Sequence, residues 1–89
     1  MSKEQFIPYV ENVHSFLLRF QDSDLIDGTL LVQHNLRAQY PVVVVYNNAN
    51  QVVTDDVDSI TYLDEDRILL DVNDFTPLPG AWHVRVVRD

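Results

Sequence analysis

The sequence predicts an all-β protein: a single small antiparallel β-sandwich of immunoglobulin-like type, with about 6–7 strands. Two observations support this fold class. Valine occurs 14 times, against three alanines and one methionine, and valine is stiff at χ1 and packs well on a pleated sheet. Short apolar or alternating runs also recur roughly every 8–12 residues between turn residues, which is typical of sandwiches.

The length limits the chain to one domain. At 89 residues it falls within the usual size of a single domain, about 50–200 residues. We expect residues 15–89 to form the sandwich and residues 1–14 to form an N-terminal arm. Apolar residues at helical spacing predict an extended segment or a short helix over 4–13. Alternating apolar residues over 15–20 predict the first strand.

The next part of the chain predicts further strands. Residues 29–34 alternate in polarity, as a half-buried strand does. Residues 42–46 are apolar on both faces, which predicts a central strand or one covered by a partner subunit. The asparagine-rich segment 47–50 predicts a hairpin turn that returns the chain through 51–54.

The last third predicts a second hairpin and a closing strand. Segments 60–63 and 67–72 flank an acidic turn at 64–66, and a stiff turn at 77–80 precedes a strand at 82–87. Alternate residues of a strand share one face. Ile68, Leu70 and Val72 are expected to share one face of their strand, and Trp82, Val84 and Val86 to alternate with His83, Arg85 and Val87 in the last one.

Charge and composition disfavour several classes of partner. The chain has 6 Lys and Arg against 14 Asp and Glu, for a formal net charge of −8. Phosphate backbones and anionic membranes both attract basic residues, so we expect neither nucleic acid nor membrane as a partner. No cysteine is present, which excludes disulfides and thiolate metal sites. No segment has the pattern of a transmembrane span or a signal peptide.

No residue pattern predicts catalysis, and we expect neither enzymatic activity nor a cofactor. His14, His34 and His83 lie on separate segments without a zinc-binding spacing. None of the serines occupies a Gly-x-Ser-x-Gly turn, and two glycines are too few for a phosphate-binding loop.

Calcium is the strongest inorganic candidate. Asp22, Asp24 and Asp27 lie within one loop, but the order differs from an EF-hand, because Gly28 stands seventh and Gln33 occupies the twelfth position. Aspartate also favours turns, since its side chain accepts hydrogen bonds from nearby backbone amides. Turn formation is the simpler interpretation of this cluster.

Aromatic residues leave carbohydrate binding open. Trp82 and the tyrosines Tyr9, Tyr40, Tyr46 and Tyr62 would form a stacking platform if several pointed outward. A single tryptophan in a small sandwich more often fills the core, so we expect Trp82 to be buried.

Several segments follow one another in a recognisable order: Leu25–Leu36, Pro41–Tyr46, Asn47–Val53, Asp56–Ile60, Arg67–Val72 and Pro79–Val84. A short strand ends in a His-Asn-Leu corner, a valine-rich strand and an asparagine hairpin follow, and a Pro-Gly-x-Trp strand closes the chain. This order resembles the small β-sandwich modules of tailed-bacteriophage virions. The acidic turn at 64–66 departs from the asparagine-bearing turn of those modules, and the arm has no counterpart in them.

The resemblance implies a non-enzymatic virion structural protein, made in the host bacterial cytoplasm, that assembles onto the tail, neck or capsid, including capsid decoration. Its implied partners are copies of itself, in a homotrimer or homohexamer, and other virion proteins. The alternative function is a receptor- or carbohydrate-binding module of a tail-fibre tip or a secreted protein.

Two groups of residues have expected roles. His34 is expected to bond to a loop carbonyl and Asn35 to adopt a positive φ. The structural corner and core residues are His34, Asn35, Leu36, Gly80 and Trp82. The candidate subunit interface consists of Phe6, Ile7, Tyr9, Val10, Val42 and Val44.

Overall fold

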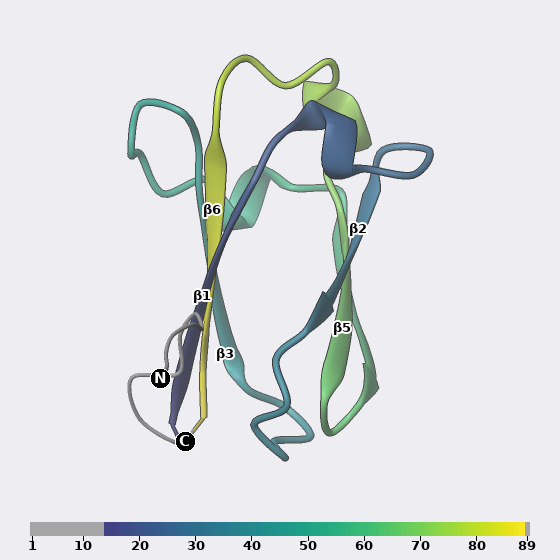
Figure 1. Cartoon of the computed structure of the whole chain (residues 1–89), viewed down its shortest axis with the longest axis vertical. Coiled ribbons are helices and arrows are strands. Elements are labelled where there is room, and N and C mark those ends of the chain that lie inside the picture. The colour runs from purple at the N-terminus through teal and green to yellow at the C-terminus, as the bar shows by residue number, and fades with distance from the viewer. Residues whose placement is uncertain (1–13, 89) are drawn as a thin grey trace, which may run out of the picture.

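Within residues 14–88, six antiparallel strands form two three-stranded sheets that pack face to face, as Figure 1 shows nearly edge-on. The first sheet has the order β1-β6-β3 and the second has the order β2-β5-β4. The strands are β1 Ser15–Phe20, β2 Thr29–Gln33, β3 Val42–Tyr46, β4 Ser59–Asp64, β5 Arg67–Asp71 and β6 Trp82–Val87. The predicted small all-β sandwich is therefore confirmed.

The computed structural model describes residues 14–88. The predicted arm segment at 4–13, with its candidate interface residues, lies outside the described residues. The first strand begins at Ser15, where the alternating pattern placed it.

The core lies between the two sheets and is built from the inward side of each strand. Ile68 and Leu70 of β5 are fully buried, and so are Val84 and Val86 of β6. Alternation with period 2 sends their neighbours to the outer faces. The predicted division of both segments into two faces is thus confirmed, and the core takes one face of each. Val72, which was expected to share the face of Ile68 and Leu70, is buried just beyond the end of β5.

Among the described residues, three short 3-10 helices lie toward one end of the sandwich, in the upper part of Figure 1. They are η1 Asp22–Asp24, η2 Thr54–Asp56 and η3 Asn73–Phe75. Each contains aspartate in its first turn, where acidic side chains favour the exposed N–H groups of a helix start.

Strand β3 is an edge strand, so the prediction of a central strand is wrong. It pairs only with β6 within the described sheet, and its opposite edge is partly covered by the following chain. Val45 donates its N–H to Thr54 Oγ1 at 2.9 Å and accepts a hydrogen bond from the Val53 N–H at 2.8 Å.

The predicted hairpin turn at 47–50 is present: Asn50 donates its N–H to the Asn47 carbonyl at 3.0 Å, and the chain returns beside β3. Only an isolated bridge joins Val52 to Tyr46, after which the chain turns into η2. The Thr54 hydroxyl accepts the hydrogen bond from the Val45 N–H that the backbone carbonyl of a neighbouring strand would otherwise accept. The chain therefore leaves the edge of β3 after one bridge instead of extending along it.

The predicted second hairpin is confirmed. Strands β4 and β5 pair in antiparallel register from Ser59 opposite Asp71 to Asp64 opposite Arg67, with an irregularity between Tyr62 and Asp64. An extra residue in one strand of a pair bends that strand and changes the direction of its side chains. Leu63, which lies at this irregularity of β4, is exposed.

Candidate functional site

One candidate interaction surface is the outward side of the β1-β6-β3 sheet, called the outer face below. Leu17 of β1 and Val44 of β3 both lie opposite Arg85 of β6, so all three project to the same side. The outer face consists of Ser15, Leu17, Arg19, Val42, Val44, Tyr46, His83, Arg85 and Val87.

Apolar side chains of the outer face are open to solvent. Leu17 is 49% exposed and Val42 is 48% exposed, while Val44 and Val87 are half-buried. The structure thus places the candidate interface residues Val42 and Val44 together on this face. Contiguous exposed apolar groups of this kind are typical of interaction surfaces.

A shallow, open hollow of about 280 Å³ lies on the outer face. Its lining residues are Leu17, Tyr46, Asn50, His83 and Arg85. The turn at 47–50 curves outward beside β3 in Figure 1 and brings Asn50 to the rim. The hollow therefore combines apolar surface with hydrogen-bond donors from β6.

Charge is distributed unevenly between the outer face and the ends of the sandwich. The three strands of this sheet contain no Asp or Glu. Arg19 and Arg85 form no ion pair with any residue among 14–88. By contrast, the end that carries the 3-10 helices holds Asp22, Asp24, Asp27, Asp55, Asp56, Asp58, Asp71 and Asp74. The outer face is thus cationic and apolar on a strongly acidic chain.

The loop carboxylates at the acidic end stabilise turns. Asp24 accepts a hydrogen bond from the Gln21 backbone N–H at 2.9 Å. Asp22 Oδ1 accepts one from the Leu78 N–H, and Asp58 Oδ2 accepts one from the Asp74 N–H. Within residues 14–88, no three His, Asp or Glu side chains are grouped so that they could hold a metal ion.

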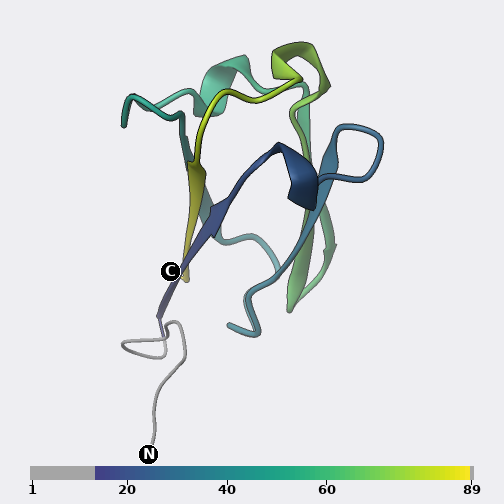
Figure 2. The ribbon, with the colours of Figure 1, turned by 45° about the horizontal axis from the view of Figure 1, so that its top comes forward.

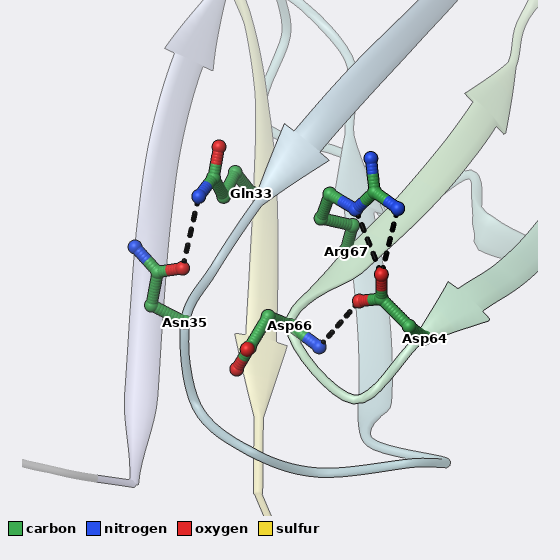
Figure 3. Close-up of polar contacts among 5 residues, drawn as sticks. All are labelled: Gln33, Asn35, Asp64, Asp66 and Arg67. Carbon is green, nitrogen blue, oxygen red and sulfur yellow. Dashed lines mark hydrogen bonds and ion pairs between the residues drawn. The ribbon is translucent and has the colours of Figure 1, made fainter.

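The corner after β2 is held against the β4–β5 turn, and Figure 3 shows the side chains of Gln33 and Asn35 at the corner and of Asp64, Asp66 and Arg67 at the turn. The backbone N–H groups of His34 and Asn35 both donate to the Asp66 carbonyl, and the Arg37 N–H donates to Asp66 Oδ1. Asn35 has a φ of 56°, which confirms its predicted positive φ, and Arg37 has a φ of 54°. Leu36 between them is buried, as expected.

At the same turn, Arg67 donates from Nε to Asp64 Oδ2 at 2.9 Å and forms an ion pair with the same oxygen (Figure 3). The Arg67 guanidinium is the main reason that the pKa of Asp64 is lowered, and the Asp66 N–H contributes to the shift. Two carboxylates of the acidic turn at 64–66, those of Asp64 and Asp66, therefore accept hydrogen bonds from neighbouring residues.

His34 makes a different contact from the one predicted. Its backbone, and not its ring, bonds to the loop carbonyl, while its ring Nδ1 accepts a hydrogen bond from the Leu36 N–H at 3.1 Å. The proton of the neutral ring must then reside on Nε2. The ring is 1% exposed, and Nε2 has no hydrogen-bond partner among the described residues.

Burial lowers the pKa of His34 from its ordinary value of 6.5, and the carboxylates of Asp66 and Asp64 partly oppose this shift. The unfolded chain therefore takes up a proton at higher pH than the folded protein does. We expect the free energy of unfolding to fall as the pH decreases below about 6.5, by less than about 1.4 kcal/mol per pH unit, until folded His34 is also protonated. Urea unfolding between about pH 7.5 and pH 5.5 measures this slope.

The matched variant for this prediction is His34→Gln, whose amide oxygen replaces the Nδ1 acceptor but does not titrate. Its unfolding free energy should depend less steeply on pH over the same interval. An unchanged slope would show that another group causes the dependence.

The remaining predicted structural residues occupy the expected positions. Gly80 has a φ of 73°, a conformation that glycine adopts without strain. Trp82 is 2% exposed and lies in the core. The exposed tyrosines do not form a flat stacking platform, because Tyr40 and Tyr62 pack edge to face at 5.6 Å and the Tyr62 hydroxyl donates to the Pro41 carbonyl.

Sequence reasoning missed the hollow on the outer face. Its signal was present in the strand at 82–87, where His83 and Arg85 alternate with the inward residues. That pattern places them outward, but it does not show that Leu17 of β1 and Tyr46 of β3 lie beside them. Those neighbours depend on strand order.

Among the described residues, no helix is both long and apolar enough to cross a bilayer. Comparisons with known protein families, with curated proteins and with solved structures found no match.

Proposed function

We propose that this chain is a non-enzymatic structural module of a tailed-bacteriophage virion, and that it works by homo-oligomeric assembly onto the tail, neck or capsid. The order of its corners and strands supports the virion context. The exposed apolar side chains of the outer face support assembly.

The outer face is suited to a subunit contact for two physical reasons. Its apolar residues Leu17 and Val42 lose contact with water when they are covered, which is favourable by roughly 25 cal/mol per Å². The strands beneath them carry no carboxylates, so a second acidic molecule approaches this face without the repulsion it meets at the acidic end.

We expect the full chain to sediment as a trimer or hexamer at high micromolar concentration. Val42→Lys should weaken this association by at least about tenfold, because it places a charge where an apolar side chain is covered. Analytical ultracentrifugation over a concentration series measures the effect. Val42 is half exposed, so the variant should fold.

Leu31→Lys is the matched control, because Leu31 is 53% exposed on the outward side of the other sheet. It should leave the assembly intact. A clean monomer for the unmodified chain would overturn the assembly proposal. If Leu31→Lys dissociates the assembly and Val42→Lys does not, the subunit contact lies on the β2-β5-β4 sheet instead.

The virion context has a separate test. Genes for capsid, connector or tail proteins beside the gene for this chain, and the chain itself in purified particles, are the expected findings. An isolated gene whose product is missing from particles would contradict this part of the proposal.

A further inference from the structure

We propose that the chain assembles head to tail: the loop that carries Ile26 in one copy docks into the hollow on the outer face of the next. This inference rests on the proposed self-assembly and names the two surfaces that meet. It requires that the loop and the hollow match in shape, polarity and charge, and that one copy uses both at once.

The Ile26 loop, defined as residues 24–29, presents an unusually exposed apolar side chain. Ile26 is 76% exposed, the highest value for any large hydrophobic residue among those described. Asp24 and Asp27 flank it. The loop therefore displays an aliphatic group between two carboxylates.

The same loop is held rigidly. Ile26 and Thr29 exchange backbone hydrogen bonds of 2.9 and 3.0 Å, and the Thr29 hydroxyl donates to the Ile26 carbonyl. Asp27 and Gly28 both have positive φ, as a tight two-residue hairpin turn requires. Asn73 of η3 donates its side-chain amide to the Asp27 carbonyl at 3.0 Å. A loop ordered in advance loses little conformational entropy on binding.

The hollow has the complementary chemistry. Leu17 and Tyr46 supply apolar surface for an aliphatic side chain, and His83 and Arg85 supply donors beside it. Arg85 and Arg19 have no ion-pair partner among residues 14–88. Carboxylates on either side of an inserted Ile26 would meet these guanidinium groups, where charge-assisted hydrogen bonds are strong.

The loop and the hollow lie on opposite sides of one molecule. Figures 1 and 2 both show the chain between η1 and β2 projecting beyond the β2 side, whereas the hollow belongs to the outward side of the β1-β6-β3 sheet. A copy therefore cannot fill its own hollow with its own loop. Such a contact is heterologous, and it closes into a ring when the rotation between copies permits.

Two single variants and two matched controls test this contact in the full chain by analytical ultracentrifugation. Ile26→Ser removes the inserted side chain, and Arg85→Glu reverses the charge in the hollow. Each should weaken self-association by about tenfold or more. Leu63→Ser is the control for the first, because Leu63 is 43% exposed on β4 of the other sheet, at the end away from the Ile26 loop. Arg88→Glu is the control for the second, because it changes the net charge equally at an exposed site off the three strands.

Mixing the two variants gives the sharpest test. Ile26→Ser retains an intact hollow, and Arg85→Glu retains an intact loop that can dock into it. Their mixture should therefore form a 1:1 heterodimer, to which no further copy can bind because the remaining loop and the remaining hollow are both altered. Association of the unmodified chain should also weaken with added sodium chloride, because exposed charge pairs are screened by salt.

The outcomes separate this inference from the proposed function. If the unmodified chain is monomeric, the self-assembly proposal itself fails. If it assembles but Ile26→Ser behaves as Leu63→Ser does, assembly stands and the head-to-tail contact is overturned. A mixture of the two variants that contains only monomers also overturns it.

Discussion

Replacing Trp82 with alanine is expected to lower the free energy of unfolding by about 3–5 kcal/mol, because it leaves a large cavity in the core. Trp82 is 2% exposed and lies between two other rings. Its ring centroid is 5.0 Å from that of Phe75, with the rings edge to face, and 6.4 Å from that of Phe20. The indole joins the start of β6 to the end of β1 and to η3, so its removal loosens the acidic end of the sandwich.

Thermal unfolding followed by circular dichroism measures this effect. Each kcal/mol moves the Tm of a domain of this size by about 4–8 °C. Trp82→Phe is the graded control and should cost less than the alanine variant, because it keeps a ring and removes an indole N–H that has no acceptor among the described residues. A Tm for Trp82→Ala within a degree or two of the unmodified chain would contradict the packing described here.

Gly28→Ala is expected to lower the free energy of unfolding by about 2–4 kcal/mol, from backbone strain and steric overlap together. Gly28 has a φ of 79°, which is unfavourable for alanine. A Cβ at this position would lie 2.6 Å from Asn73 Cγ. Asn73 cannot move freely, because its side-chain amide bonds to the Asp27 carbonyl.

Two further variants separate the two causes of the Gly28→Ala effect in urea unfolding. Gly80→Ala has nearly the same φ, but its Cβ would meet only Asn48 Cβ at 3.2 Å, so it should cost about 1–2 kcal/mol. In an Asn73→Ala background the cost of Gly28→Ala should fall toward that of Gly80→Ala. Equal costs for Gly28→Ala in both backgrounds would show that the overlap is relieved elsewhere.

Strand faces were predictable because the period of a β-strand is 2. The alternation over 82–87 separated Trp82 and Val84, which lie in the core, from His83 and Arg85, which lie on the outer face. The β4–β5 hairpin was predictable for a related reason, since turn residues separated two apolar runs.

The position of a strand within its sheet was not predictable in the same way. Five apolar residues at 42–46 predicted a central strand, yet β3 lies at an edge and only Val43 and Val45 face the core. An apolar side chain indicates that its face of the strand is covered, whether by the same chain or by another molecule. It does not indicate whether the backbone of the strand is hydrogen-bonded to neighbouring strands on both sides.

By itself, the sequence determined the fold class, most strand boundaries and the two faces of the strands, because these depend on local period and turn chemistry. The tertiary structure alone decided the strand order, and strand order assembled the outer face and its hollow from three segments distant in the chain. It also placed the aspartates of three separate loops at one end and Ile26 on the side opposite the hollow. Such juxtapositions depend on which strands pair, a long-range property that no window of residues encodes.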